Sequence, residues 1–432
     1  MNVHSAFWFR RDLRLDDNKA LHAALTSGQP VLPVFIFDRH ILEELPARDG
    51  RVEFIHQTLT EMDLQLREMG SGLIVRYGVP EEIWPQLVEE YSISAIYTNH
   101  DYEPYAATRD GMIAEMVSDK GAVFHTFRDQ VIFEKDEILT KAGKPYTVFS
   151  PYARNWRATL TPERLKDVGT EVHFASFAKH ESQTIPSLSS MGFAPSGLDF
   201  PARIPDKEII KVYDQKRNFP AQQGTTRIGI HLRFGTMSIR KLARVAQRLN
   251  DTYLNELIWR EFYMQILWNF PHVVTQPFRP EYEAVQWKND EADFEAWKAG
   301  KTGYPMVDAG MRELNSTGYM HNRVRMITAS FLTKHLLIDW RWGEAYFAEK
   351  LLDFELSSNN GGWQWASSSG TDAAPYFRIF NPESQFKKFD SEGKYVRKYV
   401  PEFGTPAYPR EIVDHKFARQ RCLDTYKTAL KG

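Results

Sequence analysis

Apolar and polar positions alternate along the first 130 residues in a pattern that predicts strands and helices in turn. Four short apolar runs end in turn-forming residues, and they span residues 6–9, 31–37, 73–77 and 95–98. Amphipathic helical stretches such as residues 51–69 separate these runs. Such alternation is typical of βαβ units. It therefore predicts an α/β domain over residues 1–130 with a parallel, Rossmann-like sheet.

The pattern changes beyond residue 130. Residues 131–205 lack periodicity, and proline, serine and glycine are scattered through 184–205, so we expect an interdomain linker there. Over residues 206–432 the apolar positions recur with the 3.6-residue period of helices. A chain of 432 residues is long for one hydrophobic core. We therefore expect two domains, of which the second is all-α.

Composition narrows the protein class. The single cysteine, Cys422, excludes an intrachain disulfide and a cysteine-cluster metal site, and we expect no metal. No apolar stretch approaches the roughly 20 residues that span a bilayer, and the first residues lack the features of a signal peptide. We expect a cytoplasmic, monomeric protein without a membrane partner. The net charge of −2 argues weakly against nucleic-acid binding, although a neutral total can contain a basic groove.

The segment from Asp353 to Tyr376, DFELSSNNGGWQWASSSGTDAAPY, is unusual in its chemistry. Asn359 and Trp363 are spaced to share one helical face. Gly361 and Gly362 lie between them, and each costs about 1 kcal/mol in a helix interior relative to alanine. Adjacent glycines are useful where a bulky planar group approaches the backbone. The residues alone leave open a planar-ligand site or a tryptophan-rich core turn.

A second group of residues lies on a predicted helix. Glu256, Trp259, Arg260 and Tyr263 are spaced i, i+3, i+4 and i+7 and so share one face. A carboxylate beside an aromatic ring could bind a nucleobase by hydrogen bonding and stacking. An ordinary amphipathic helix with a Glu–Arg pair explains the same spacing, and the residues alone favour that simpler interpretation.

Residues 359–365 (NNGGWQW) and 370–382 (GTDAAPYFRIFNP) closely resemble the flavin-binding signature of DNA photolyases and cryptochromes. The match is closest to class I cyclobutane pyrimidine dimer photolyases. It covers nearly the whole chain, is strongest over residues 213–398, and includes residues 9–18, which resemble the opening of the family's antenna domain.

This resemblance implies non-covalent FAD and an all-α FAD-binding domain. It also implies the activity of a deoxyribodipyrimidine photo-lyase, a carbon–carbon lyase whose partner is DNA containing pyrimidine dimers. Excited, reduced FAD would donate an electron to the dimer. The alternative is a cryptochrome-type blue-light photoreceptor without repair activity. A nucleotide-binding enzyme based on the sheet alone would leave the second half unexplained, and no GxGxxG follows the first predicted strand.

The resemblance also assigns residues to the cofactor. Those expected to bind FAD are Tyr213, Thr225, Thr226, Arg227, Ile228, Gly229, Asn322, Arg325, Asp353, Glu355 and Asn359. Within this set, Asn359 matches the residue that faces flavin N5, and Arg325 matches one that pairs with Asp353. Trp363, Trp340 and Trp287 match the family's electron-transfer chain. Three core tryptophans are the alternative interpretation of that match.

A further set is expected to bind DNA or the lesion: Arg217, Glu256, Trp259, Tyr263, Asn322, Arg323, Met326, Trp365, Arg378 and Gln385. Glu256 would stabilise charge that develops on the dimer carbonyls. Photolyases for the (6-4) photoproduct carry histidines at the positions of Asn322 and Met326, so the resemblance implies cyclobutane dimers. The run 378–398 has six basic and three acidic residues, a pattern also typical of a solvated face.

The resemblance is weakest for the antenna chromophore. Folate-binding members have an Asn-Glu pair and a Cys-Lys pair where this chain has Tyr105-Ala106 and Val273-Val274. We therefore expect no folate, and another second chromophore, or none, remains open.

Overall fold

The structure is a computed structural model that describes residues 3–431, and the chain divides into two compact units. Unit 1 consists of the residues up to Glu137, Thr159–Ile204 and Ile228–Arg248. Unit 2 consists of Ile138–Ala158, Pro205–Arg227 and the residues from Leu249 onward.

This division differs from the single linker expected over residues 131–205. That segment contributes to both units and contains helix α6 (Phe149–Thr159). Helix α10 (Ile239–Leu249) was expected in the helical domain but belongs to unit 1 up to Arg248. The buried guanidinium of Arg240 on α10 pairs with Asp17 and Asp129 of unit 1. Breaking such a buried ion pair is costly, which explains the placement of α10.

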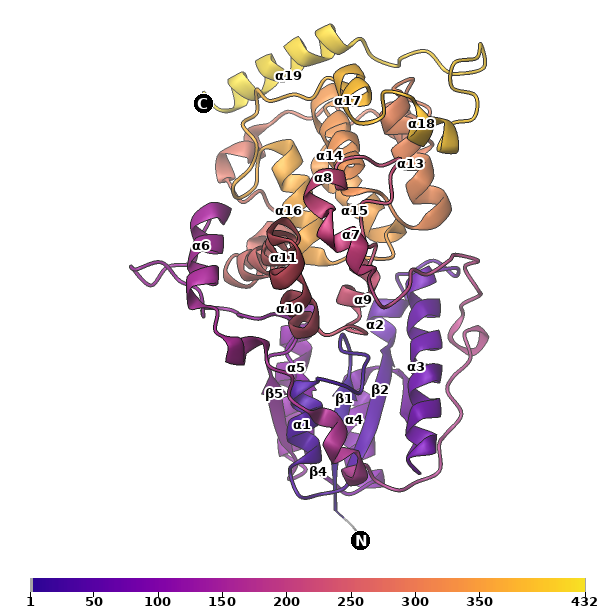
Figure 1. Cartoon of the computed structure of the whole chain (residues 1–432), viewed down its shortest axis with the longest axis vertical. Coiled ribbons are helices and arrows are strands. Elements are labelled where there is room, and N and C mark those ends of the chain that lie inside the picture. Colours follow the sequence, from indigo (N-terminus) through magenta and orange to yellow (C-terminus); the bar gives the residue numbers. More distant parts are fainter. Residues whose placement is uncertain (1–2, 432) are drawn as a thin grey trace. The chain divides into compact units, whose positions relative to one another are not determined.

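A five-stranded parallel sheet forms the centre of unit 1 (Figure 1). The strands lie in the order β3-β2-β1-β4-β5. Their bounds are β1 (His4–Phe9), β2 (Val31–Asp38), β3 (Ile74–Gly78), β4 (Ile93–Asn99) and β5 (Val123–Phe127). The predicted α/β domain with a parallel sheet is confirmed, and the four predicted apolar runs correspond to β1–β4.

Strand β5 is the element that the apolar pattern did not predict. It lies at the edge of the sheet, and Val123 at its start is 53% exposed. None of its five residues is buried. Strand β2, by contrast, is buried along its whole length, as expected for a parallel strand that is covered on both faces.

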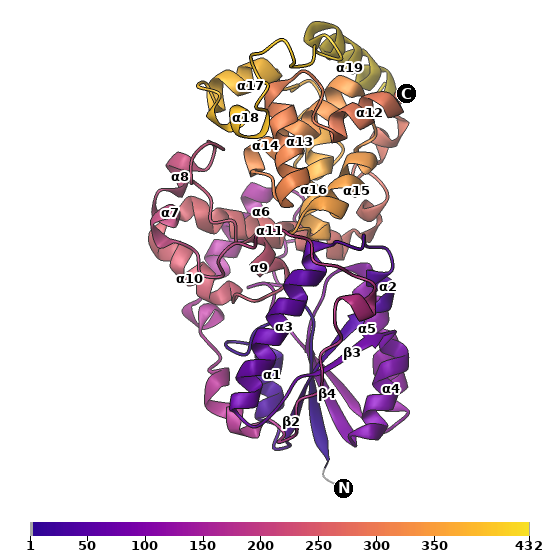
Figure 2. The same cartoon turned by 90° about the vertical axis from the view of Figure 1, so that its right-hand side faces the viewer.

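Helices cover both faces of this sheet. Helices α1 (Lys19–Leu25) and α3 (Gly50–Glu68) follow β1 and β2, whereas α4 (Pro80–Glu90) and α5 (Pro104–Ser118) follow β3 and β4. Crossovers between parallel strands are right-handed. Because the strand order reverses between β1 and β4, the two pairs of helices lie on opposite faces (Figure 2). Unit 1 also contains α2 (Arg39–Leu42) and α9 (Gly229–Arg233).

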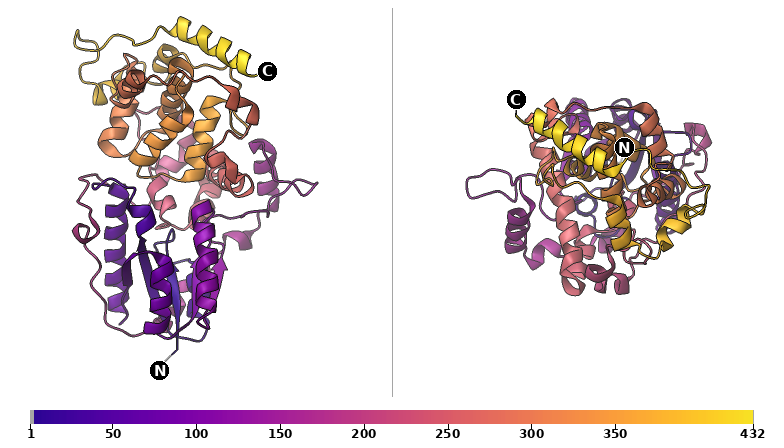
Figure 3. Two further views of the ribbon diagram at one scale, coloured as in Figure 1. Left: turned by 180° about the vertical axis from the view of Figure 1, so that it is seen from behind. Right: turned by 90° about the horizontal axis from the view of Figure 1, so that it is seen from above.

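Unit 2 is helical, which confirms the prediction for the second domain. Its helices besides α6 are α7 (Lys207–Lys211), α8 (Tyr213–Lys216), α11 (Asp251–Asn269), α12 (Glu291–Lys298), α13 (Pro305–Thr317), α14 (Asn322–Ser330), α15 (Trp340–Lys350), α16 (Leu356–Ser367), α17 (Pro382–Phe389), α18 (Lys394–Tyr399) and α19 (His415–Ala429). A π-helical turn, Phe331–Leu336, follows α14 and packs against α19, which runs along the outside of the unit (Figure 3). Among residues 3–431, no helix is both long and apolar enough to cross a membrane.

Candidate active site

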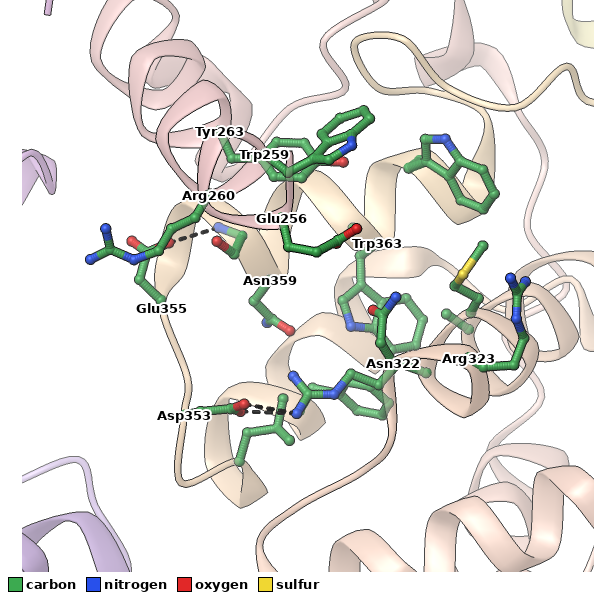
Figure 4. Close-up of a pocket in the computed structure, with 18 of the residues that line it drawn as sticks. Glu256, Trp259, Arg260, Tyr263, Asn322, Arg323, Asp353, Glu355, Asn359 and Trp363 are labelled. Atoms are coloured by element: carbon green, nitrogen blue, oxygen red, sulfur yellow. Dashed lines mark hydrogen bonds and ion pairs between the residues drawn. The ribbon is translucent and has the colours of Figure 1, made fainter. Parts of the chain in front are cut away.

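Unit 2 contains a cavity of about 450 Å³. Side chains from α11, α14, α15 and α16 form much of its wall, together with residues of the segments 213–225 and 351–355 (Figure 4). Cavities of roughly 300–1,000 Å³ are typical of cofactor and small-molecule sites. This cavity is therefore the candidate site of unit 2.

The cavity brings together most of the site residues that the sequence predicts. Those that line it are Tyr213, Arg217, Thr225, Glu256, Trp259, Tyr263, Asn322, Arg323, Arg325, Met326, Asp353, Glu355, Asn359, Trp363 and Trp365. Predicted residues that do not line it are Thr226, Arg227, Ile228, Gly229, Trp287, Trp340, Arg378 and Gln385. Lining residues outside the predicted set are Asn218, Arg260, Ala329, Phe347, Leu351, Phe354, Ser358 and Gly362.

Tyrosines hold the loop of residues 225–229, which belongs to the set expected to bind FAD. The hydroxyl of Thr226 lies 2.8 Å from the hydroxyl of Tyr253, and that of Thr225 lies 3.2 Å from the hydroxyl of Tyr319. The guanidinium of Arg227 lies 4.6 Å from the centroid of the Tyr319 ring. Thr226 and Arg227 are therefore engaged with the protein itself, and within this loop Thr225 is the residue that reaches the cavity.

Helix α11 presents Glu256, Trp259, Arg260 and Tyr263 to the cavity from one face, in agreement with their spacing (Figure 4). Phe149 of α6 stacks on Trp259, with ring centroids 3.6 Å apart and an angle of 7° between the planes. One face of the indole is therefore covered by a protein ring, which fixes the plane of Trp259 at the cavity wall.

The two adjacent positions Gly361 and Gly362 of α16 favour glycine for different reasons. A Cβ added at Gly361 would lie 2.2 Å from the Tyr263 ring, so the bulky planar group that approaches this glycine belongs to the protein itself. A Cβ at Gly362 would meet no atom within 4 Å, and Gly362 lines the cavity. The glycine pair thus allows close packing of α11 on α16 and widens the cavity beside it.

Helix α16 begins with a carboxylate cap. The side chain of Glu355 accepts hydrogen bonds from the backbone N–H of Ser358 (2.9 Å) and from the hydroxyl of Ser357 (2.6 Å). A charged acceptor at a helix N-terminus satisfies backbone donors and complements the helix dipole. Glu355 therefore positions the start of the helix that carries Asn359, Trp363 and Trp365.

An ion pair lies on the cavity wall between α14 and the segment before α16 (Figure 4). A terminal nitrogen of Arg325 lies 3.1 Å and 2.9 Å from the two carboxylate oxygens of Asp353. The Nε of Arg325 also donates to the backbone carbonyl of Met320 at 2.7 Å. These contacts hold the guanidinium plane in place, as the predicted pairing of Arg325 with Asp353 requires.

Asn359 is oriented by a residue that the sequence interpretation missed. Its side-chain Nδ2 donates to the carboxylate of Glu344 (2.8 Å) and to the backbone carbonyl of the same residue (3.1 Å). Both donors of the amide are thus used, which leaves the acceptor Oδ1 as the group that Asn359 can present to a ligand. Burial raises the pKa of Glu344 to about 6. Glu344 lies on the preceding helix, α15, where no motif points to it.

Glu256 and Arg217 form an ion pair at the cavity. Burial raises the pKa of the Glu256 carboxyl, and the charge and hydrogen bond of Arg217 oppose that rise without cancelling it. The two residues are 39 positions apart in the chain and come from different elements. The sequence places each of them in the DNA-binding set but does not predict that they bind one another.

The three tryptophans of the predicted chain share one hydrophobic cluster. Trp340 and Trp363 are each 2% exposed, and the partly buried Trp287 packs against the same cluster. A Cβ added at Gly343 would lie 2.1 Å from the Trp363 ring, so this glycine lets α15 approach the indole closely. Trp363 and Trp340 are therefore buried, whereas Trp287 is only partly buried.

Comparisons with known proteins identify the family. Residues 5–170 match the model of DNA photolyase, and residues 253–406 match the FAD binding domain of DNA photolyase. The chain belongs to the DNA photolyase family. This membership confirms the family predicted from the sequence, and the second match supports FAD as the cofactor.

Relatives that match nearly the whole chain are also photolyases. The chain is 37% identical to a deoxyribodipyrimidine photo-lyase of Synechococcus, over 97% of this chain and 96% of that protein. It is 38% identical to the Escherichia coli deoxyribodipyrimidine photo-lyase, over 98% of each. Among solved structures, a bacterial class III photolyase from Agrobacterium tumefaciens has a TM-score of 0.89 and 33% identity, with 100% of this chain and 98% of that chain covered. The predicted enzyme class is therefore confirmed.

Proposed function

We propose that this protein repairs cyclobutane pyrimidine dimers in DNA by a light-driven electron transfer from FAD bound in the cavity of unit 2. One observation carries the proposal. The residues that resemble a flavin site and those that resemble a lesion site line the same cavity, although they come from four separate stretches of the chain, 213–225, 256–263, 322–326 and 353–365. An electron donor and its acceptor must lie close together for such a reaction, and this cavity offers that arrangement.

The cavity fits a flavin in its chemistry. The Asp353–Arg325 pair offers a fixed charge pair, and Asn359 offers an oriented carbonyl oxygen. Gly362 leaves space at the wall for a planar group. We infer that Tyr213, Thr225, Asn322 and Glu355 complete the binding set. When bound and reduced, FAD supplies the electron that excitation by light makes available, while the protein binds, orients and tunes the electrostatic environment.

The lesion side of the cavity combines stacking and hydrogen bonding. Trp259 and Trp365 offer two aromatic surfaces, of which Trp259 is held by Phe149. Glu256 offers a carboxyl group to the carbonyl oxygens of a dimer that has left the base stack. As negative charge grows on those oxygens, a positioned donor stabilises it more strongly than in the ground state.

We infer that cyclobutane dimers are the substrate and that (6-4) photoproducts are not. Asn322 and Met326 line the cavity at the positions where the (6-4) enzymes carry histidines. Neither side chain can act as a general acid at neutral pH, and proton transfer from such an acid is what the histidines provide.

The test uses the FAD-loaded, chemically reduced protein and two single-lesion oligonucleotides under blue light. One oligonucleotide carries a cyclobutane thymine dimer and the other a (6-4) lesion, with dark samples as controls. We expect light-dependent recovery of thymine absorbance with the first substrate alone. Repair of the (6-4) lesion would overturn the substrate assignment. Binding of flavin without repair of either lesion would favour the photoreceptor alternative.

A further inference from the structure

The ion pair between Arg217 and Glu256 joins two groups that the proposed function uses separately. Glu256 is the carboxyl group expected to meet the dimer, and Arg217 is a guanidinium expected to meet a DNA phosphate. In the structure each satisfies the other. The side chain of Glu256 is 33% exposed and that of Arg217 is 34% exposed. An incoming strand can therefore reach both without unfolding any element.

The other charges on the cavity wall do not replace Arg217. Besides Glu256, the charged residues that line the cavity are Arg217, Arg260, Arg323, Arg325, Asp353 and Glu355. Arg325 is held by Asp353, and Arg323 donates to Asn218 and lies 4.6 Å from the Phe389 ring centroid. The titratable tyrosines near Glu256 are Tyr213 and Tyr263. Among residues 3–431, the cation within ion-pair distance of Glu256 is Arg217.

We propose that Arg217 is a switch that couples DNA binding to protonation of Glu256. A DNA phosphate takes the guanidinium away from Glu256, and the carboxylate, left without a cation, takes up one proton from water. Glu256 then meets the dimer as a neutral acid. This inference rests on the proposed function, because it requires the cavity to receive a dimer and the strand beside it.

Two physical arguments support the exchange of partners. An ionised carboxylate accepts hydrogen bonds but cannot donate one, whereas a protonated carboxyl can donate to a carbonyl oxygen. The dimer carbonyls are acceptors, so a hydrogen bond from Glu256 to them needs this proton. In addition, a partly buried carboxylate that loses its cation while a base covers it is left desolvated, and both changes favour the neutral form. The burial of Glu256 already favours that form, and Arg217 opposes it.

Arg217 gains a partner of similar strength in the exchange. Guanidinium–phosphate contacts are charge-assisted and frequently bidentate, like the guanidinium–carboxylate contact that they would replace. The positive charge of Arg217 is therefore satisfied before and after binding. The net change at the site is one proton, which a calorimetric measurement can count.

The experiment measures proton uptake when the FAD-loaded protein binds a single-stranded oligonucleotide with one cyclobutane dimer, under red light that does not drive repair. Titration calorimetry in buffers of different ionisation enthalpy gives the number of protons taken up per complex. We expect about one proton for the unaltered protein in part of the range from about pH 6 to about pH 8. Glu256→Gln should reduce that number to zero.

Variants of the arginines separate the switch from a simple phosphate contact. Arg217→Gln removes the cation before DNA arrives, so the pKa of Glu256 should already be higher in the free protein and the uptake on binding should be smaller than in the unaltered protein. Arg217→Lys keeps a cation and should keep most of the uptake. Arg323→Gln is the matched control, because it removes a second cavity arginine that is not paired with Glu256. It should weaken binding and leave the proton number unchanged.

The outcomes distinguish this inference from the proposed function. No selective binding of the dimer oligonucleotide by the unaltered, flavin-loaded protein would count against the proposed function itself. Tight binding without proton uptake would overturn the inference alone, since Glu256 would then stay ionised beside Arg217. Undiminished uptake in Arg217→Gln would also overturn it. Thermal melting of each variant checks the fold, and if Arg217→Gln does not fold, the comparison of Arg217→Lys with Glu256→Gln decides.

Discussion

At the scale of single residues, the stacking of Phe149 on Trp259 assigns the two faces of this indole different roles. Phe149 covers one face within the protein, while Trp259 also lines the cavity. A ring that is already held in place loses little further side-chain entropy when a base stacks on it. We therefore propose that Trp259 is a rigid platform for one base of the lesion rather than a flexible contact.

We expect Trp259→Ala to lower the affinity for dimer-containing DNA by about 1–3 kcal/mol, the usual contribution of one base–aromatic stack. Fluorescence anisotropy with a labelled oligonucleotide measures the dissociation constant. Trp259→Phe keeps an aromatic face on Phe149 and should retain most of the affinity. Equal affinities of the alanine variant and the unaltered protein would assign Trp259 to packing alone.

A second prediction at the residue scale concerns Glu344 and pH. Burial raises the pKa of this carboxyl to about 6, so the folded protein holds the proton more tightly than the unfolded chain does. The stability contributed by this proton is fully present below the unfolded-state pKa. It is lost as the pH rises through about 6. Above that pH, the folded protein bears the cost of a buried, ionised carboxylate.

Glu344→Gln removes this cost and keeps an acceptor for Asn359. The free energy of unfolding of the variant, relative to the unaltered protein, should rise by about 2 kcal/mol between about pH 4 and about pH 8. Urea denaturation at each pH measures this difference. Glu349→Gln on the same helix is the matched control, since the Glu349 side chain is 48% exposed, and it should show no such trend. A flat difference for Glu344→Gln would show that its carboxyl is not perturbed.

At the scale of elements, helix α16 shows which features a sequence can predict. The spacing of Asn359 and Trp363 predicted a helix with one functional face, and both residues line the cavity. The glycine pair predicted a close approach, but Gly361 is approached by Tyr263 of α11, a partner about 100 positions away. Local spacing thus predicts the face of a helix. Which side chain arrives from another helix depends on tertiary packing, and the same holds for Glu344.

The sheet also contains elements that the sequence predicts and one that it does not. Strands β1–β4 could be predicted because strands buried on both faces read as continuous apolar runs. Strand β5 could not, since its residues are all at least partly exposed. The ion pair of Arg217 with Glu256 had no local signal either, because the two side chains come from separate elements and neither spacing nor composition links them.

The aromatic cluster of α15 and α16 supports a prediction at the same scale. If Trp363, Trp340 and Trp287 pass electrons to the cavity, then Trp363→Phe should abolish photoreduction of bound, oxidised FAD by an external donor. Repair by protein that was chemically reduced beforehand should persist, because that electron does not pass through the tryptophans. Absorbance of the flavin during illumination measures the first property.

The control for this prediction is another tryptophan of the same cluster. Trp297 lies 6.0 Å from Trp363 between ring centroids but is outside the predicted chain. Trp297→Phe should leave photoreduction close to that of the unaltered protein. Normal photoreduction in Trp363→Phe would return Trp363 to a packing role. Loss of photoreduction in Trp297→Phe alone would place the electron-transfer route through Trp297.

At the scale of the whole molecule, the net charge of −2 gives no sign of a polyanionic partner. The distribution of charge matters more, because arginines gather at the cavity while many other basic side chains are neutralised by neighbours. Lys387 pairs with Glu383, and Lys394 with Glu392, so part of the basic run over residues 378–398 is a solvated, compensated surface. Arg378 in the same run is exposed, and we propose that it contacts a phosphate.

This distinction predicts different salt dependences for two residues of one segment. Each phosphate contact releases counterions, so Arg378→Gln should reduce the slope of log affinity against log salt concentration by about one. Lys387→Gln removes a charge that Glu383 already compensates and should leave the slope nearly unchanged. Binding of dimer-containing DNA across a range of salt concentrations measures both slopes. If both variants change the slope equally, then the charge of the whole segment acts on DNA, and the local ion pairs do not determine which residues bind it.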